Sequence, residues 1–446
     1  MLKCALCKKA ATFLMVAFVM VVFSSMSVMA QAESVDVEDS IALYDLIVSD
    51  EAVIGEFIQL PPTFDSPDYF VELIRQFMER RTSALIEPSR RGLTSSFDVP
   101  LHISVEPKIN MNMSNEFGNF NSSSIVINES VSILSYEKTA FNSLNDLRDV
   151  VSQHGTIYVA FDSDLILLSY EISDNVAVIS VEMFTRLYFA SDAGGPPYTA
   201  WYDEREFTFN RMRSGWTMVS HRLLDDTLIR PLNEPPHISR EQMAVELQII
   251  GDAESRARGL YERVELERVE LESLEMVPFS SGRFNRAAAV NYAREWWNRR
   301  NPFFASYDLN CTNFVSQALM AGGWTEVRAT FPMFQRQNTR YWWPGHPRDP
   351  LLPSSWSFIG VNYFRDFALN NSGRRTVNGS SFLLVIGDVV QTTGWMQHTM
   401  IVTTVTADGR AFLTYNTRDT LDAPLAHLIA GNPGLTWHFL LNMGSW

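Results

Sequence analysis

Apolar side chains recur at helical spacing near residue 70 and at strand spacing from about residue 156. Within Tyr69–Leu85 they stand three or four residues apart, which predicts an amphipathic helix, and 141–151 predicts a second, shorter helix. The Asn- and Ser-rich stretch 110–124 between them predicts a loop. Strand-like runs follow at 156–161, 165–172, 175–190, 198–211 and 216–222. Turn residues separate these runs, so we expect an antiparallel meander and an α+β fold.

A charged stretch, 236–281, divides the chain into two parts. It follows Pro235-Pro236 and contains the sequence RVELE twice in succession. Its strong helix formers predict a helix that acts as a solvated linker, although the alternation of VELE also permits a strand. Residues 33–235 then form a separate N-terminal α+β domain, whose helices followed by long strands loosely resemble a cystatin-like cone, and residues 282–446 form a second domain.

Two helices and a run of strands are expected in this second domain. Asn285 can cap the first helix and Pro302 marks its end. The second helix lies within 310–323, where apolar residues form one stripe and two glycines close it. Strand-like runs follow at 383–385, 387–391, 398–406 and 411–417. Asp408-Gly409 predicts a two-residue turn between the last two runs, so we expect a helix packed on an antiparallel sheet.

The start of the chain has the marks of a secretory signal peptide. Three lysines form a basic opening, an apolar run extends from Ala10 to Phe23, and an A-x-A site ends at Ala32. The apolar run is shorter than the roughly 20 residues of a spanning helix. We therefore expect a cleaved signal at 1–32 and a secreted or cell-envelope protein that meets the membrane only through this segment. A retained anchor is the alternative.

The charge balance narrows the classes of partner. The chain carries 36 Lys and Arg against 51 Asp and Glu, a formal net charge of −15. Nucleic acids require a basic footprint for their phosphates, so we expect no nucleic-acid partner. Acidity on an exported protein mainly serves solubility, and it indicates neither the substrate nor the oligomeric state.

Cys311 is the one cysteine that remains once a signal at 1–32 is removed. A leftover cysteine in an exported protein is either reactive or pairs between chains, and a buried thiol acting as a small apolar side chain is the alternative. Cys311 stands at the predicted start of the helix within 310–323. Unpaired N–H groups and the helix dipole can lower the pKa of a thiol there and can bind an oxyanion. This position favours a nucleophile.

A thiol nucleophile needs a base, and the base needs an orienting group. His398 opens the first strand of the predicted hairpin, from where its imidazole can reach a helix start packed on the sheet. Asn416, near the end of the partner strand, is the candidate orienting group. Simple pairing from the two-residue turn sets Asp419 opposite His398 and Asn416 opposite Ile401, so Asp419 is the alternative orienting group.

Residues from about 284 to the end resemble the putative amidase domain family of bacterial exported proteins. The matching segments, in chain order, are AAAVNYAREWWNRRNPFF, NCTNFVSQALMAGGW, SWSFIGVNYFRDFAL, GDVVQ, HTMIVT and LTYNTRD. That family is similar in turn to CHAP- and NlpC-type cell-wall peptidases, whose papain-like core carries a cysteine on a helix and then a histidine and a polar residue on successive strands. The resemblance implies that Cys311 is the nucleophile, His398 the base and Asn416 the third member.

Two positions depart from the pattern of that family. It usually has Asp immediately before the cysteine, where this chain has Asn310, and often His at the third position, where this chain has Asn416. Asn310 and Asp388 are candidates for oxyanion or substrate contact, although Asp388 can instead be a turn residue that fixes the start of a strand. The scattered histidines have no companions at metal-ligand spacing, so we expect neither a metal nor a cofactor.

The sequence thus predicts an exported cysteine hydrolase. We expect it to cleave an amide or peptide bond through a thioester of Cys311, with a peptide or peptidoglycan-like substrate in the cell wall. An acyltransferase that uses the same residues, and a non-catalytic exported binding protein with a degenerate cysteine site, are the alternatives.

Overall fold

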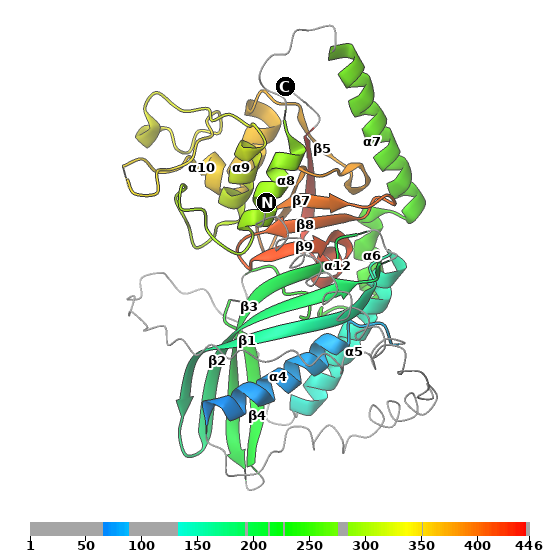
Figure 1. The fold of residues 1–446 in the computed structure, drawn as a ribbon, viewed down its shortest axis with the longest axis vertical. Coiled ribbons are helices and arrows are strands. Elements are labelled where there is room, and N and C mark those ends of the chain that lie inside the picture. The colour runs from blue at the N-terminus through cyan, green and yellow to red at the C-terminus, as the bar shows by residue number, and fades with distance from the viewer. Residues whose placement is uncertain are drawn as a thin grey trace, which may run out of the picture. The chain divides into compact units, whose positions relative to one another are not determined.

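The computed structural model describes residues 66–88, 133–191, 195–212, 215–225, 228–274, 284–349 and 351–442. The predicted signal peptide at 1–32 and the predicted loop at 110–124 lie outside these residues. Within the described ranges no helix is both long enough and apolar enough to span a membrane. All of these described residues belong to one compact unit, and its elements are labelled in Figure 1.

Two helices lie beside the first strands. Helix α4 (Pro67–Ser83) confirms the predicted first helix, with Ser66 as its N-cap and a proline at its start. Helix α5 (Ile133–Gln153) is longer than the predicted 141–151. Buried residues of α4, among them Phe70 and Ile74, pack against the first sheet strands in one apolar cluster. Burial of these apolar stripes explains why both segments are helical here.

An antiparallel meander follows the two helices, as the alternation predicted. Its strands are β1 (Tyr158–Ile172), β2 (Val176–Phe189), β3 (Tyr198–Met212) and β4 (Gly215–Leu223). The runs 156–161 and 165–172 are joined in one strand, because the polar residues between them pair in register with β2. Asp162, for example, lies opposite Arg186, whose Nε donates to its carboxylate at 2.6 Å.

The charged stretch after the meander is helical, as expected, but it is not only a solvated spacer. It contains α6 (Arg240–Glu246), the 3-10 turn η3 (Leu247–Ile250) and α7 (Ala253–Leu274). Gly259 of α7 lies against the C-terminal part so closely that a Cβ there would be 2.5 Å from the backbone oxygen of Phe382. Arg263 is fully buried and donates to the backbone oxygen of Asn442 at 2.9 Å. Helix α7 is therefore packed on the C-terminal part.

The C-terminal part begins with helices and ends with strands. Its helical segments are α8 (Arg286–Trp296), α9 (Cys311–Ala321), η4 (Pro332–Phe334), α10 (Trp356–Ile359), α11 (Val361–Asp366), η5 (Phe367–Asn371), η6 (Ser381–Leu383) and α12 (Leu425–Gly431). Its strands are β5 (Thr376–Gly379), β6 (Val389–Thr393), β7 (His398–Val405), β8 (Ala411–Tyr415), β9 (Thr420–Pro424) and β10 (Thr436–Asn442). The predicted strand at 383–385 is wrong, because Leu383 ends the 3-10 turn η6 and the next two residues belong to no strand. Elements β9, α12 and β10 were not predicted.

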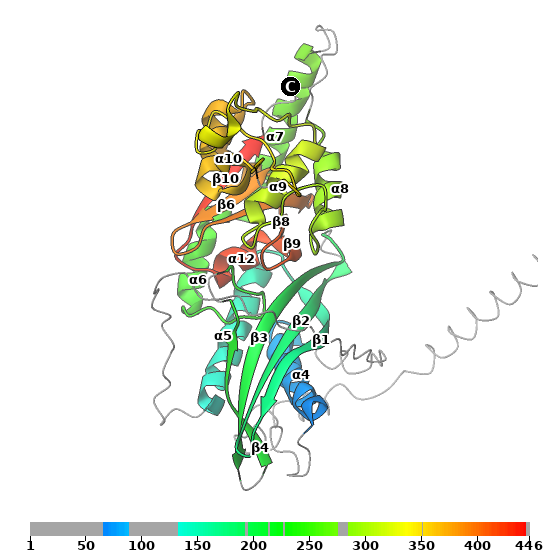
Figure 2. The ribbon, with the colours of Figure 1, turned by 90° about the vertical axis from the view of Figure 1, so that its left-hand side faces the viewer.

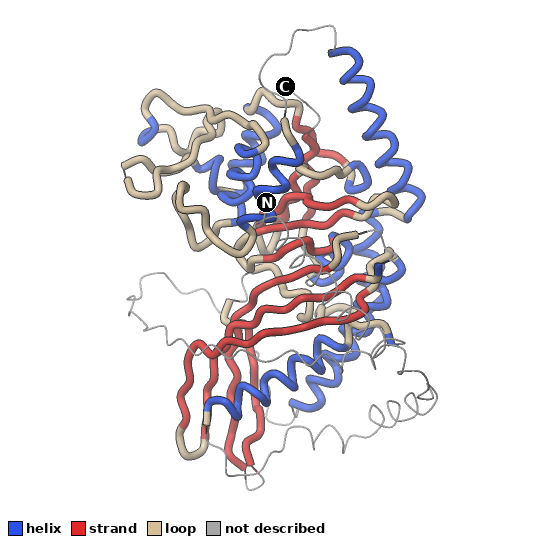
Figure 3. Tube along the Cα trace, viewed as in Figure 1, coloured by secondary structure: helices blue, strands red, loops and turns tan. Residues whose placement is uncertain are grey.

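One antiparallel sheet runs through both parts of the described chain, in the order β1-β2-β3-β9-β8-β7-β6-β10-β5, with β4 also paired to β3 (Figure 3). The link is at the start of β3, where Ala200 pairs with Leu421 and Trp201 with Thr420. The two parts also share one apolar core, in which Phe189 of β2 contacts the ring of Phe412 of β8. The separate N-terminal domain and the papain-like arrangement are therefore not confirmed, although the α+β class is.

The two faces of the C-terminal strands are buried against different helices, as can be followed in Figures 1 and 2. Ile401 belongs to the cluster that contains the apolar residues of α8 and α9. Met400 and Val402 belong to the cluster that contains α12 and residues of α5. Side chains alternate between the faces of a strand, so the sequence MIV of β7 serves both cores. This alternation decides where the residues near Cys311 point.

The turn between β7 and β8 is longer than predicted. Val405 pairs with Ala411, so that five residues form the turn, and Thr406 Oγ1 accepts from the backbone N–H of Arg410 at 3.0 Å. A bulge follows between Val402 and Thr404. Ile401 consequently pairs with Thr414, and the predicted pairing of Asn416 with Ile401 and of Asp419 with His398 was wrong.

Candidate active site

Helix α9 begins at Cys311, on the side of the helix that packs against the sheet. Phe314, Val315 and Ala318 form the buried stripe that turns this face inward. The Cys311 residue is 6% exposed and is a free cysteine. Cys311 therefore lies at a helix N-terminus, as the sequence predicted.

A chain of side-chain amides holds the residue before Cys311. Asn313 Nδ2 donates to Asn310 Oδ1 at 2.8 Å, and Asn310 Nδ2 donates to Asn416 Oδ1 at 2.8 Å. Asn416 Nδ2 donates in turn to the backbone oxygen of Trp297 at 2.5 Å, just after α8. The backbone N–H of Asn310 donates to Thr417 Oγ1 at 2.7 Å. The helix start is thus fixed to both α8 and the end of β8.

Hydroxyl groups hold the first turn of α9 against β7. Thr312 Oγ1 and Thr399 Oγ1 are 2.9 Å apart and share a hydrogen bond. Gln391 of β6 donates from Nε2 to Thr399 Oγ1 and to the backbone oxygen of Val361, each at 3.0 Å. Sequence reasoning missed Thr312, Thr399 and Gln391. The sequence signal for such residues is a polar side chain within a segment whose other residues are mainly apolar.

His398 is the first residue of β7 and pairs with Thr392 of β6. It is 2% exposed, its ring meets the ring of Tyr415 edge to face with centroids 4.9 Å apart, and its Nε2 is buried without a hydrogen-bond partner. Thr399 faces α9, so the alternation of the strand directs His398 towards the opposite core. In the described part of the chain no hydrogen bond joins His398 to Cys311 or to Asn416.

Burial governs the protonation of both predicted catalytic groups. It raises the pKa of the Cys311 thiol, against the backbone groups of Thr399, Thr312 and Cys311 itself that favour the thiolate. Burial, assisted by the nearby Arg418 guanidinium, lowers the pKa of His398 to about 3. At neutral pH this arrangement holds a neutral thiol and a neutral imidazole. The lowering of the thiol pKa expected from the helix start is outweighed by desolvation.

The turn after Asn416 connects the helix start to the N-terminal part. Thr417 and Arg418 have φ of 65° and 60°, the left-handed region that is uncommon for residues with a side chain. Arg418 Nη2 donates to the backbone oxygen of Asp225, and the N–H of Tyr202 in β3 donates to the backbone oxygen of Asp419 at 3.1 Å. Residues that precede residue 235 therefore fix the turn, and Thr417 of this turn accepts the hydrogen bond from Asn310.

The two predicted carboxylates near the site are both bonded inside the fold. Asp419 accepts from Arg300 Nη1 at 3.0 and 3.1 Å and from the N–H of Thr417 at 3.0 Å. Burial raises its pKa, although Arg300 acts in the opposite direction. Asp388 is fully buried and accepts from Arg286 and from the backbone of Val385 and Asn442. Neither carboxylate bonds to His398 in the described residues, and Asp388 fastens helices to strands.

A small polar hollow lies on the other side of the helix start. Asn310, Asn313 and Asn416 line it together with Arg300 and Gln317, and its volume is about 10 Å³. That is about the room that one water molecule needs. Among the described residues no group of three or more His, Cys, Asp or Glu side chains has the geometry to hold a metal ion. The predicted absence of a metal and a cofactor stays a prediction.

One family model matches the C-terminal part of the chain. Residues 283–440 match the model of a family described as a putative amidase domain, the family that the sequence motifs indicated. An amide hydrolase is the class of enzyme that this match supports. The further similarity to CHAP- and NlpC-type peptidases stays a prediction.

Two relatives from Bacillus subtilis (strain 168) match part of the chain. One, "Uncharacterized protein YhbB", is 36% identical over 129 residues, which are 27% of this chain and 37% of that protein. The other, "Uncharacterized protein YjcM", is 28% identical over 161 residues, which are 33% of this chain and 34% of that protein. The match thus spans about a third of each relative. A crystal structure of the Kfla4162 protein from Kribbella flavida is 16% identical over 20% of this chain and 55% of its own, and its TM-score of 0.16 carries no argument.

Proposed function

We propose that the protein is an exported cysteine amidase in which Cys311 attacks the carbonyl carbon of an amide and His398 is the base. One observation carries the proposal. Cys311 begins a helix whose first turn is held on Thr399, the neighbour of His398, and the buried Nε2 of His398 has no hydrogen-bond partner. A buried imidazole nitrogen without a hydrogen-bond partner lowers the stability of a fold by about 1–3 kcal/mol. A role in catalysis would explain why this one is kept.

The reaction proceeds in two balanced steps. The Cys311 sulfur forms a bond to the carbonyl carbon while its proton passes to His398, and the tetrahedral intermediate then expels the amine, which takes that proton. Water, deprotonated by His398, breaks the resulting thioester and releases the carboxylic acid and the thiol. The N–H groups at the start of α9 are placed to bind the oxyanion.

Burial leaves both groups neutral at rest. An imidazole whose pKa lies near 3 is unprotonated at neutral pH but is a weak base towards a thiol, so the proposal requires substrate binding to raise the pKa of His398 towards neutrality. The resting side chains are not hydrogen-bonded to one another and His398 starts on the opposite face of β7 from α9, so the start of β7 must rearrange to bring His398 to Cys311 when substrate binds. Hydrogen bonds of a catalytic site are often longer before substrate binds than after it.

Export and a cell-wall peptide substrate belong to the same proposal. The basic, apolar and A-x-A segments at 1–32 support export. Peptide amides of the cell wall are the substrates that an exported bacterial amidase meets. An acyltransferase would use the same residues and would differ only in the acceptor that releases the thioester.

The test uses the chain from residue 33 and purified peptidoglycan. We expect wild type to release new amines, and Cys311→Ala and His398→Gln to lose at least about a thousandfold in rate. His346→Gln, which changes an exposed histidine, is the matched control and should retain activity. Acid quenching followed by mass spectrometry should find an acyl group on the peptide that contains Cys311. Amine release that survives Cys311→Ala would exclude this nucleophile, and an acyl-enzyme formed only with other amides would reject the cell-wall substrate.

A further inference from the structure

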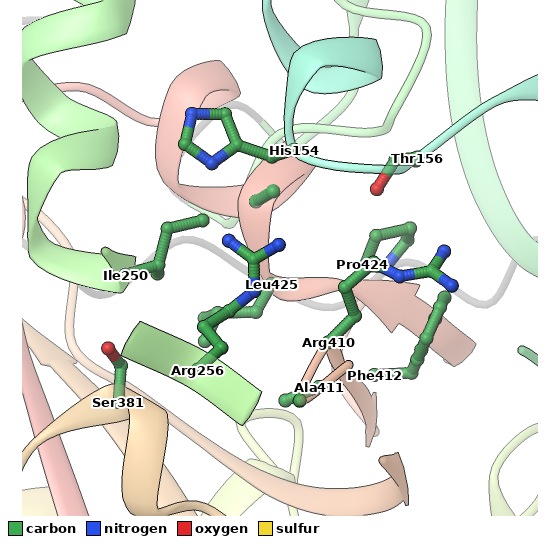
Figure 4. Close-up of a pocket in the computed structure, with 12 residues that line it drawn as sticks. His154, Thr156, Ile250, Arg256, Ser381, Arg410, Ala411, Phe412, Pro424 and Leu425 are labelled. Carbon is green, nitrogen blue, oxygen red and sulfur yellow. The ribbon is translucent and has the colours of Figure 1, made fainter. Parts of the chain in front are cut away.

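A second cluster of polar side chains lines a cavity away from Cys311, between the α5–β1 connection, the start of α7 and strands β8 and β9 (Figure 4). The cavity has a volume of about 20 Å³. Its polar lining consists of His154, Thr156, Arg256, Ser381 and Arg410, and the rest of its wall is mainly apolar. These residues come from four stretches that are far apart in the sequence.

Arg256 is the unusual member of this cluster. It is 5% exposed, its Nη1 donates to the backbone oxygen of Gly251 at 2.9 Å, and its Nε is buried with no hydrogen-bond partner. The guanidinium group points into the cavity towards His154 in Figure 4. Within the described residues Arg256 forms no ion pair. A buried arginine is rarely left without a paired charge, because desolvating the cation is costly.

The neighbouring carboxylates favour the Arg256 cation through space, but neither is bonded to it. Asp408 is bonded to Arg410, whose Nε donates to both carboxylate oxygens at 2.8 and 3.0 Å. Asp252 is solvent-exposed and accepts from the N–H of Ser255 at 2.7 Å at the start of α7. Burial and the charge of Arg256 both lower the pKa of His154, so that the imidazole adds no anion and no second cation at neutral pH. The cavity is left with a buried cation that no carboxylate contacts directly.

The backbone around the cavity is fitted to the two arginines. A Cβ at Gly409, whose φ is 74°, would lie 2.8 Å from both Cβ and the backbone oxygen of Arg256. A Cβ at Gly155, whose φ is 84°, would lie 2.9 Å from Cδ of Arg410. Arg410 Nη1 also donates to the backbone oxygen of Gly155 at 2.6 Å. These contacts fix the Arg410 guanidinium group and the backbone of Arg256, and the bond from Arg256 Nη1 to Gly251 orients the second guanidinium group.

We propose that this cavity binds a small oxyanion, a phosphate or a carboxylate, with Arg256 as its principal cationic partner. A planar guanidinium group matches the paired oxygens of either anion. One water needs about 10–15 Å³ on this measure, so the volume of about 20 Å³ has room for the one or two oxygen atoms of an anion that approach the guanidinium group, and none for a large organic molecule. The bound anion joins the α5–β1 connection, α7 and the β8–β9 region, so binding stabilises the contact between the N-terminal and C-terminal parts of the chain.

The test measures thermal unfolding of the full mature chain, freed of oxyanions and held at constant ionic strength. Sodium phosphate and sodium acetate are titrated separately against sodium chloride. We expect a saturable rise of the Tm, on the order of 2–4 °C, with at least one oxyanion and none with chloride. The arm that saturates at lower concentration distinguishes the phosphate source from the carboxylate source. An equal response to all three salts would overturn the proposal.

Variants distinguish a ligand-binding role of Arg256 from a purely structural one. Arg256→Met should abolish the oxyanion-dependent rise, and without oxyanion it should be at least as stable as wild type because it removes a buried cation that no carboxylate contacts directly. Arg258→Met, at an exposed position of the same helix, should respond like wild type. A loss of stability in Arg256→Met at every anion concentration would show a purely structural role and reject the proposal. If Arg256→Met does not fold, Arg256→Lys must weaken the oxyanion affinity at least about fivefold, since an ammonium group lacks the planar fork. Cys311→Ala must keep the full response.

Discussion

At the scale of single residues, the start of α9 depends on three asparagines. Asn310 and Asn416 are 2% and 1% exposed, and each uses its amide as both donor and acceptor. The two positions at which the chain departs from the pattern of the family that it resembles are therefore in direct contact. A carboxylate at position 310 would have no proton to donate to the Asn416 carbonyl oxygen, so the two asparagines fit each other as a pair.

We predict that Asn310→Asp and Asn416→His are each destabilising and that the double variant recovers part of the loss. Each single change should lower the free energy of unfolding by about 1–3 kcal/mol, because it leaves a buried polar group without its partner. In the double variant an imidazole N–H can donate to the new carboxylate. Urea unfolding of the four chains gives the coupling energy of the pair. Asn378→Ala, on an exposed part of β5, is the control. Strictly additive losses would mean that residues 310 and 416 do not act together.

Buried histidines make the stability of the chain depend on pH. Burial lowers the pKa of His398 to about 3 and of His427 to about 4, from an ordinary value of 6.5. Between those values the unfolded chain binds protons that the folded chain does not. The stabilisation is therefore complete above pH 6.5 and is lost as the pH falls towards 4 and then 3, at about 1.4 kcal/mol per pH unit for each histidine.

The measurement is the free energy of unfolding in urea between pH 7 and pH 4. His427→Gln should reduce the slope of the unfolding free energy against pH by about 1.4 kcal/mol per pH unit, which corresponds to one proton. The reason is that His427 is buried and bonded on both ring nitrogens, to Tyr158 and to the backbone oxygen of Leu232. His346→Gln, an exposed position, should leave the slope unchanged. A slope that is the same in His427→Gln as in wild type would show that His427 titrates normally in the folded chain.

At the scale of elements, α7 shows how a segment that reads as a linker becomes part of the fold. Its exposed apolar residues, Tyr261, Val264 and Leu266, are 71%, 56% and 51% exposed, whereas Arg263 is buried. Among the α7 side chains that the structure describes, Gly259 and Arg263 make the contact with the C-terminal part, and Val264 and Leu266 do not. Arg263 and Arg286 both donate to Asp388 and to the backbone oxygen of Asn442, which ties α7, α8 and β10 together.

We predict that Gly259→Ala lowers the free energy of unfolding by about 1–2 kcal/mol. The added methyl group would meet the Phe382 backbone at 2.5 Å, and this overpacking outweighs the gain of about 1 kcal/mol in helix propensity. Ala257→Val, which adds bulk at an exposed position of the same helix, should change stability by less than about 0.5 kcal/mol. Thermal or urea unfolding measures both. A stabilising Gly259→Ala would show that α7 is not packed at this point.

At the scale of the whole described unit, the continuous sheet makes the N-terminal meander part of the environment of Cys311. Strand β3 pairs with β9, and Tyr202 and Asp225 bond to the turn that carries Thr417. Tyr158 of β1 bonds to His427 of α12 at 2.8 Å. These contacts cross the region where the sequence predicted a boundary between domains.

We predict that the chain unfolds in a single cooperative transition. The shared core leaves no apolar interface that can separate without exposing both parts to water. Hydrogen exchange of β2 reports on the meander, and pulsed alkylation of the buried Cys311 reports on the C-terminal part. The two probes should give the same urea midpoint. A meander that loses protection at lower urea, with Cys311 still shielded, would indicate two independent domains.

Local patterns were enough to predict helices α4, α8 and α9, the four strands of the meander and the place of Cys311 at a helix start. Each depends on the period of apolar residues and on a cap or turn residue close in the sequence. The register of β7 with β8 was not predictable in this way. A threonine hydroxyl lengthened the turn to five residues and a bulge added a further shift, so that a rule based on Asp408-Gly409 alone placed the partners of His398 wrongly.

The sequence by itself therefore determined which residues are the candidates for the chemistry, because Cys311 is the one cysteine after Cys7 and the motifs around it match a family model in order. Tertiary structure alone decided what those residues meet. Asn416 bonds to Asn310 and Asp419 to Arg300, although these partners are 106 and 119 residues apart in the sequence, and the ring of His398 meets that of Tyr415 on another strand. Burial, which is a property of the assembled core, then decided that thiol and imidazole are both neutral at rest.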